Sequence, residues 1–241
     1  MVFLRFSSWN GVLNFHYDKV IRQAGVVNVE GEHMKKSIGA TTLVYPTPVF
    51  IIGTYDRNDK PNAMALAWGG ICSSEPPSVA ISVRKLRYTY DNLMERKAFT
   101  ISVPSEKYVK ESDYFGNVSG KNVDKFENSG LKPVSSKIVD APYVGEFPLV
   151  LECRVTHVTD LGAHTQFVGE IMDVKVDEDC LDEEGVPDVS KILPFWYSPS
   201  DHSYYAMGMN LGEAYRIGNE FRRKRSKECS PTVGSCTDPE G

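Results

Sequence analysis

Cysteine is scarce in this sequence, and the few cysteines are not arranged in pairs. Only five occur among 241 residues, and no two of them have the C-x-x-C spacing. An odd number of scattered cysteines is not typical of a disulfide framework or of a structural zinc site. We therefore expect a reduced intracellular protein in which most of these thiols are small apolar residues of the core.

Long apolar runs and an excess of basic residues are absent as well. No apolar run reaches the roughly 18 residues of a membrane-spanning helix, and polar residues interrupt the N-terminal stretch too often for a signal peptide. The net charge is -5, whereas a nucleic-acid-binding protein usually carries a basic face. These absences predict a soluble, cytoplasmic protein with neither a membrane nor a nucleic-acid partner.

The common cofactor and catalytic motifs are also missing. The sequence has no G-x-G-x-x-G after a strand, no P-loop, no G-x-S-x-G and no H-E-x-x-H, so no Rossmann, phosphate-loop, hydrolase or zinc-protease site is indicated. His157 and His164 are predicted to face each other across a hairpin. Because no third ligand stands at a suitable spacing, we do not expect a metal site.

Strand-like patterning is concentrated in the middle of the chain. Residues 34–218 are expected to form one domain, and the polar residues 219–241 are expected to be a disordered tail. Residues 1–33 show no clear period, and the codons for Glu30–His33 can contain a purine-rich ribosome-binding sequence. Residues 1–33 are thus expected to be a leader, or the start is misassigned and the native chain begins at Met34. The intact mass of the protein made from the native gene would distinguish a start at Met1 from a start at Met34.

Alternating apolar residues predict several antiparallel strands, whereas helical periods are few. Helices are predicted over residues 89–98 and 106–116, and strands over 48–56, 62–68, 78–84, 99–105 and on both sides of the turn at 160–162. This pattern predicts a mainly β fold with some α, an antiparallel Greek-key split β-barrel. It lacks the regular strand–helix repeat of a doubly wound fold.

A cluster of cations at a predicted helix start indicates an anion site. Arg84 and Lys85 end a strand, Arg87 and Tyr88 follow in a turn, and Thr89 is the predicted N-cap of the next helix. Free N–H groups and the helix dipole favour an anion there, and the cations and the hydroxyl add charge-assisted hydrogen bonds. An ordinary capped helix with exposed basic residues is the alternative.

The preceding stretch, ALAWGGICSSEPP, has glycines and serines where a packed strand should continue. Gly69 and Gly70 leave backbone uncovered, so a flat ring can lie against main-chain groups. Ser73 and Ser74 add hydroxyl groups beside the predicted anion site. One elongated ligand with a ring and a phosphate would fit both features; a simple β-bulge is the alternative for the glycine pair.

Several segments in order resemble the flavin reductase-like, FMN-binding split-barrel family, and within it the flavoredoxins. The similarity covers about residues 36–218 and rests on YPTPVFIIGTYD, NAMALAWGGICSSEPPSVAISVRKLRYTYDNL, FTISVPS, DYFGNVSGKNVDKF, GAHTQFVGEI and YYAMGMNLGEAYRIG. The resemblance implies FMN as cofactor, and a homodimer with the flavin near the subunit interface.

The resemblance also implies individual site residues. The ring would be lined by the segment Ala65–Ser74, with residues Ala65, Ala67, Trp68, Gly69, Gly70 and Cys72. Ser73 and Ser74 would lie near the ribityl phosphate, which would be bound by Lys85 and Thr89 with Arg84 and Tyr88 as neighbours. A loop with Phe115, Gly116 and Lys121 would close over the cofactor. His164, within the G-x-H-T-x-x-x-G signature, would lie near the flavin or the approaching nicotinamide and is the tentative catalytic residue.

Trp68 and the double glycine depart from the Asn/Thr/Ser-rich run of many flavin reductases. The indole either packs in the barrel core or shields one face of the ring. The resemblance implies an FMN-containing oxidoreductase that uses NAD(P)H to reduce flavin or another acceptor. Two alternatives stay open: an electron carrier between redox proteins without NAD(P)H activity, and a non-catalytic FMN-binding module. The sequence does not distinguish NADH from NADPH.

Overall fold

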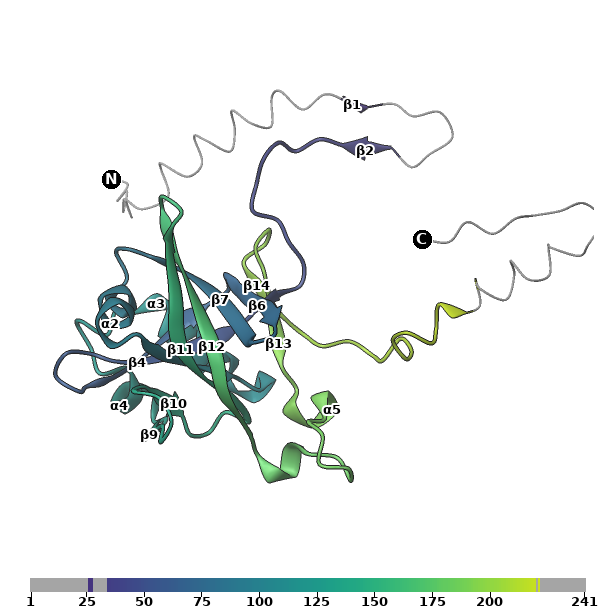
Figure 1. Ribbon diagram of the computed structural model, residues 1–241. Helices are drawn as coiled ribbons and strands as arrows, with labels where there is room; N and C mark the ends of the chain where they lie inside the picture. Colours follow the sequence, from purple (N-terminus) through teal and green to yellow (C-terminus); the bar gives the residue numbers. More distant parts are fainter. Residues whose placement is uncertain (1–25, 28–33, 220, 222–241) are drawn as a thin grey trace, which may run out of the picture. The chain divides into compact units, whose positions relative to one another are not determined.

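The computed structural model describes residues 26–27, 34–219 and 221 (Figure 1). The described residues up to Ala206 belong to one compact unit, and the described residues from Met207 onward belong to a second. The expected leader and tail lie almost wholly outside the described residues, apart from β1 (Val26–Val27), which pairs with β2 (Lys35–Lys36), and residues 219 and 221. Within the described part of the chain, no helix has the length and apolar character needed to cross a bilayer.

A seven-stranded antiparallel sheet dominates the first unit, with the strand order β5-β4-β8-β11-β12-β7-β6. Its strands are β4 (Phe50–Tyr55), β5 (Pro61–Leu66), β6 (Gly69–Ser74), β7 (Pro77–Arg84), β8 (Ala98–Val103), β11 (Leu149–Asp160) and β12 (His164–Val176). The pairs β4–β8 and β12–β7 join strands that are distant in the chain. These crossovers between hairpins are the Greek-key connections, and the mainly antiparallel β prediction is confirmed.

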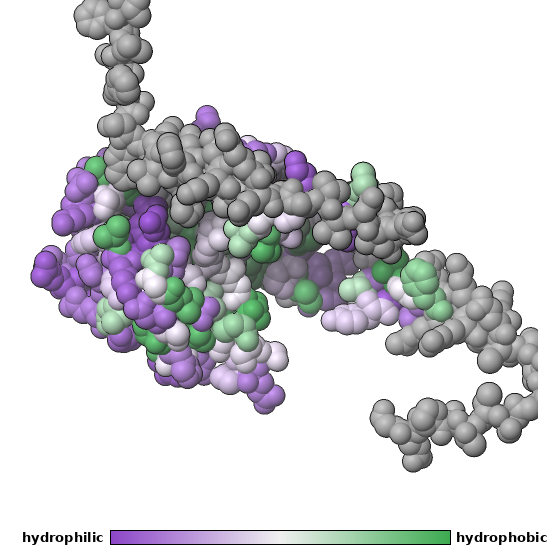
Figure 2. All heavy atoms as spheres, turned by 90° about the horizontal axis from the view of Figure 1, so that it is seen from above, coloured by the Kyte–Doolittle hydropathy of each residue, from purple (hydrophilic) through white to green (hydrophobic). Residues whose placement is uncertain are grey.

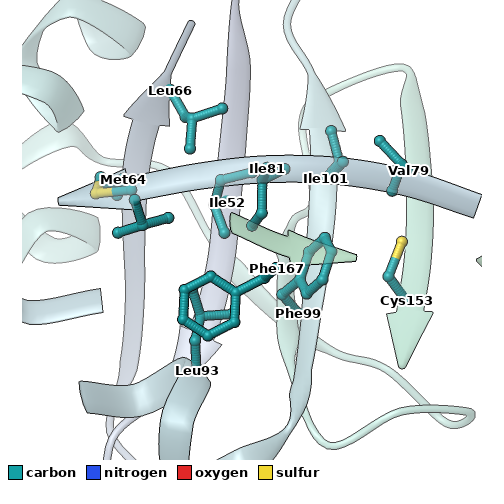
Figure 3. Close-up of a cluster of buried hydrophobic side chains, with 11 residues drawn as sticks. Ile52, Met64, Leu66, Val79, Ile81, Leu93, Phe99, Ile101, Cys153 and Phe167 are labelled. Carbon is teal, nitrogen blue, oxygen red and sulfur yellow. The ribbon is translucent and has the colours of Figure 1, made fainter. Parts of the chain in front are cut away.

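The main hydrophobic core shows that this sheet is strongly curved. Met64 on β5 and Ile81 on β7 belong to one buried cluster with Phe99 and Phe167, although β5 and β7 lie near opposite ends of the strand order. Figure 3 shows these side chains pointing toward one another between the strands. The sheet therefore curls into a barrel around a single apolar interior.

Helices and short strands complete the unit. A second buried cluster, which includes Ile51, Phe115 and Phe126, packs α3 and α4 against the sheet. The remaining elements are α2 (Tyr88–Arg96), α3 (Val109–Asn117), α4 (Lys125–Ser129), α5 (Val189–Ile192), η1 (Glu106–Tyr108), η2 (Glu178–Cys180), β3 (Thr47–Pro48), β9 (Pro133–Ser135), β10 (Pro142–Val144), β13 (Phe195–Ser198) and β14 (Ser203–Ala206). Strands β14, β13 and β3 form a three-stranded sheet. On the face seen in Figure 2, hydrophobic residues gather in patches between hydrophilic ones.

Two local predictions are wrong. Helix α2 begins at Tyr88 with Arg87 as its N-cap, because the Thr89 hydroxyl is buried and accepts a hydrogen bond from Asn62 Nδ2 (3.0 Å) instead of capping the helix. His157 and His164 do not face each other either. The β11–β12 register pairs His157 with Val168, and His164 lies at the start of β12 beside the turn.

The strand around the glycine pair is continuous. β6 runs from Gly69 through Ser74 and pairs with β7, but its register shifts between Ile71 and Ser73. The extra residue is Cys72, so the expected bulge lies at the cysteine and not at the glycines.

Candidate functional site: a pocket at the end of the barrel

A pocket of about 520 Å³ opens beside β5 and β7. Residues from α3, from the start of β12 and from the β13–β14 hairpin complete its walls. Its volume lies within the range of roughly 300–1,000 Å³ that is typical of sites for small molecules and cofactors. All of its lining residues belong to the first compact unit.

One wall of the pocket is made of small residues. Ala65 and Ala67, at and just beyond the end of β5, line the pocket together with Gly116 of α3, which packs beside Ala65. A Cβ atom at Gly116 would lie only 3.3 Å from the Cβ of Ala65, so glycine lets the helix approach the strand this closely. Small side chains along this wall leave the space beside it open, so the face of an aromatic ring system can lie against it.

A second wall is aromatic. The rings of Trp68 and His164 are parallel to within 2°, with their centroids 6.4 Å apart, and both residues line the pocket. Trp68 is 40% exposed, which excludes the alternative that it is a residue of the barrel core. Burial, followed by repulsion from Arg84, lowers the pKa of His164 below its ordinary 6.5, so the imidazole is neutral at pH 7.

Two cations give the pocket a positive end. Arg84 and Arg87 both line it, and Nη1 of Arg87 donates to the backbone oxygen of Gly116 (3.5 Å). Among the described residues, neither arginine forms an ion pair with a carboxylate. Unpaired guanidinium groups at a pocket are well suited to bind a phosphate or carboxylate.

The β13–β14 hairpin supplies a wall that the sequence did not reveal. Tyr197 Oη and His202 Nδ1 share a hydrogen bond of 2.7 Å, and Tyr204 Oη donates to Asp113 Oδ1 on α3 (2.9 Å). Burial, and then the bond to Asp113, raises the pKa of Tyr204, so its hydroxyl stays protonated and remains a donor. The aromatic run FWYSPSDHSYYA is the only local signal for these residues, and no spacing rule assigns them to a pocket.

Several residues predicted at the ring lie outside this lining. A Cβ at Gly69 would meet the Ala80 oxygen at 3.1 Å, so this glycine permits close packing, whereas a Cβ at Gly70 would meet nothing within 4 Å. Cys72 and Ser74 are exposed on β6. The Ser73 hydroxyl donates to the backbone oxygen of Glu75 (3.2 Å) and accepts from its N–H (3.3 Å).

The residues predicted at the phosphate also have protein partners. Lys85 pairs with Asp160 at 2.5 Å, which raises the pKa of this lysine. Tyr88 donates to Asp56 Oδ2 (2.7 Å), and its pKa is raised to about 12, first by burial and then by that bond. Thr89 is buried against Asn62. The phosphate-binding roles of these three residues stay predictions, and Arg84 and Arg87 are the cations that line the pocket.

The predicted closing loop is partly helical. Phe115 lies in α3 with a fully buried side chain that packs against Phe126, which corrects its placement in a loop. Gly116 follows it in the helix and does reach the pocket, and Lys121 is exposed in the segment before α4.

Over residues 26–27, 34–219 and 221, no group of three His, Cys, Asp or Glu side chains has the geometry of a metal site.

The comparisons with known proteins agree on one family. Residues 42–200 match the profile of the flavin reductase like domain. Flavoredoxin of Desulfovibrio vulgaris (Miyazaki F) is 56% identical and has a TM-score of 0.74, over 77% of this chain and 100% of that one. Flavoredoxin from Methanosarcina acetivorans is 33% identical, with a TM-score of 0.72 over 79% and 100%. An uncharacterized protein of Archaeoglobus fulgidus is 33% identical over 147 residues, which are 61% of this chain and 81% of that protein.

Proposed function

This chain belongs to the flavin reductase like domain family, and from that premise we propose that it is a flavoprotein oxidoreductase. The proposed cofactor is FMN, held in the pocket beside β5 and β7. The proposed reaction is the reduction of a flavin or another acceptor with electrons from NAD(P)H. The likeness to two flavoredoxins, one of them 56% identical over its whole length, supports a flavin as the ligand.

The observation that carries this proposal is the match between the pocket walls and the parts of FMN. The small-residue wall leaves room beside it for a flat tricyclic ring, and the indole of Trp68 gives that ring an apolar neighbour. The guanidinium groups of Arg84 and Arg87 suit a phosphate dianion. An uncharged or purely apolar ligand would leave these two guanidinium groups without a partner.

The residues of the chain would bind and orient, while the hydride chemistry is that of the flavin when it is bound. Arg84 and Arg87 would hold the phosphate. Trp68 would keep water from one side of the pocket. The neutral imidazole of His164 is able to accept or donate a hydrogen bond without adding charge, so it would orient a nicotinamide or another acceptor.

Rapid mixing under anaerobic conditions tests the reaction. With the FMN-loaded protein, NADH or NADPH is expected to bleach the flavin absorption at a rate of roughly 1 to 1000 per second, as in typical enzymes. The likeness to flavoredoxins favours a second candidate, an electron carrier between redox proteins. That candidate predicts no bleaching with either nucleotide and fast reduction by a ferredoxin-type donor. A non-catalytic FMN-binding module predicts neither.

We also propose that the protein is a homodimer that associates through the β11–β12 hairpin. This long hairpin extends beyond the rest of the sheet (Figure 1). It exposes Val158 and Leu161 near its turn and Met172 and Val174 near the other end of β12. Exposed apolar residues along one element are a candidate protein–protein contact surface.

Charge placed on this hairpin tests the dimer. The variant Met172→Glu/Val174→Glu is expected to raise the dimer dissociation constant roughly 100-fold. The proposed contact would bring the added negative charges of the two chains together, and like charges in an interface cost several kcal/mol. Light scattering after size-exclusion chromatography measures the mass. Val186→Glu, at an exposed apolar position outside the hairpin, is the matched control and should remain dimeric. A double variant with the same mass as the control would contradict this surface.

A further inference from the structure

A buried lysine lies behind the small-residue wall of the pocket. Lys125, the first residue of α4, is only 5% exposed. Its Nζ donates to the backbone oxygens of Ala63 (2.7 Å) and Phe115 (2.9 Å). In the described part of the chain it has no carboxylate partner, and the neighbouring Asp124 pairs with Lys60. A buried ammonium ion without a counter-ion is costly, which calls for a reason specific to this place.

The two acceptors of Lys125 belong to the two elements that form the pocket wall. Ala63 lies in β5, the strand that carries Ala65, and Phe115 immediately precedes Gly116 in α3. One ammonium group therefore ties the helix to the strand at the point where both line the pocket. Its removal would take the side-chain donor away from two buried carbonyl groups.

A second cation binds at the same end of α3. Phe115 and Gly116 are among the last residues of this helix, whose terminal carbonyl groups attract positive charge. Lys125 binds the first carbonyl from inside the fold, and Arg87 approaches the second from the pocket. The two cations are therefore close enough for the charge of one to act on the other.

We propose that Lys125 is a positioning residue of the pocket, which holds α3 against β5 and takes up a proton when an anion binds at Arg87. The anion is of the phosphate class. With the phosphate of FMN as this anion, the inference rests on the proposed function.

The electrostatic surroundings support this coupling. Burial, and after it the charge of Arg87, lowers the pKa of Lys125 from 10.5 to about 8. The described elements around Lys125 bring no free carboxylate to it. β5 has no charged residue, and Asp113 on α3 is bound to Tyr204 and Asn117. On the side of α4, Asp124 is paired with Lys60, and Lys121 and Glu127 are exposed. A phosphate on Arg87 would offset the repulsion, so the ammonium form of Lys125 would be favoured in the complex.

The pH dependence of binding follows from this difference in pKa. Below about pH 8 the lysine is charged with and without ligand, and affinity does not change. Above that pH the free protein loses the proton before the complex does, so the affinity falls, in total by the factor by which the bound anion raises this pKa. Riboflavin, which has the ring but no phosphate, should show less than about a twofold change.

Titrations of FMN and riboflavin from about pH 7 to about pH 9.5 test the coupling. Lys125→Arg keeps a charge and donors that do not titrate in this range, and should bind FMN with no such pH dependence. Lys125→Met should also be independent of pH, and should bind both flavins roughly tenfold more weakly, because the wall is no longer held. A merely structural lysine would change affinity in the variants but leave the pH profile of the wild type flat. A flat wild-type profile, or an unchanged slope in Lys125→Arg, would overturn the coupling.

A measurement without flavin separates this inference from the proposed function. In the lysine-labelled protein, the NMR signal that disappears in Lys125→Arg should titrate near pH 8, and inorganic phosphate should move its midpoint upward. A midpoint in the ordinary lysine range, or one that ignores phosphate, would overturn the inference even in a protein that binds FMN. Failure to bind FMN together with a phosphate-sensitive midpoint would overturn only the proposed function.

Discussion

Replacing both Arg84 and Arg87 with glutamine is expected to weaken FMN binding by at least roughly 100-fold. Charge-assisted hydrogen bonds contribute about 1.5–3 kcal/mol each, and each 1.4 kcal/mol corresponds to about a tenfold change in the dissociation constant. Because no carboxylate among the described residues pairs with either arginine, their removal leaves no buried negative charge behind. Riboflavin binding should change by less than about threefold, since riboflavin lacks the phosphate. Fluorescence titration with both flavins measures the two constants.

The matched control is Lys85→Gln, which removes the cation that the sequence assigned to the phosphate. Lys85 pairs with Asp160 on the surface, and loss of an exposed pair costs little stability. FMN affinity should stay within about threefold of the wild type. If Lys85→Gln weakens FMN more than the double arginine variant does, the phosphate binds where the sequence predicted it, and the pocket has been assigned to the wrong part of the ligand.

Gly53→Ala is expected to lower the free energy of unfolding by about 3 kcal/mol or more. Gly53 lies in β4 where β10 crosses the sheet, and a Cβ there would lie 2.0 Å from the backbone oxygen of Pro142 and 2.5 Å from Thr100 Oγ1. Those two atoms are joined by a hydrogen bond of 2.6 Å. A backbone carbonyl has no rotamer by which to move aside, so β10 must shift and that bond must lengthen.

Thermal unfolding measures this effect against a control in the same sheet. For a chain of this size, about 3 kcal/mol corresponds to a melting temperature lowered by roughly 6–12 °C. Gly70→Ala places the same methyl group where nothing lies within 4 Å, and should change stability by less than about 0.5 kcal/mol. Equal melting temperatures for the two variants would show that β10 does not pack on Gly53 as described.

The sequence predicted the strands better than their arrangement. The apolar run in PVFIIGTYD and the alternation before and after Asp160 depend on neighbours in the chain, and those hairpins are found in the structure. The pairing of β4 with β8 and of β12 with β7 depends on contacts between distant segments. Thr89 shows the same limit on a smaller scale. A hydroxyl at a helix start normally caps it, but Asn62, far away in the sequence, draws this one into the core.

The site residues also differ in whether they are close in the sequence or are brought together only by the fold. Ala65, Ala67 and Trp68 lie within four residues of one another, the family resemblance assigned them to one site, and all three line the pocket. His202 and Tyr204 reach the pocket only because the β13–β14 hairpin folds back onto α3, where Tyr204 finds Asp113. Gly69 was predicted to uncover the backbone for a ring. Only the fold shows that its missing side chain makes room for Ala80 and Leu66.

The absorption spectrum of the purified full chain, with mass identification of any released cofactor, tests the central claim most directly. We expect a yellow protein that shows flavin absorption, or acquires it on titration with FMN at one equivalent per chain, and releases a molecule with the mass of FMN. A colourless protein that shows no saturable change when FMN is added would contradict the assignment of this pocket.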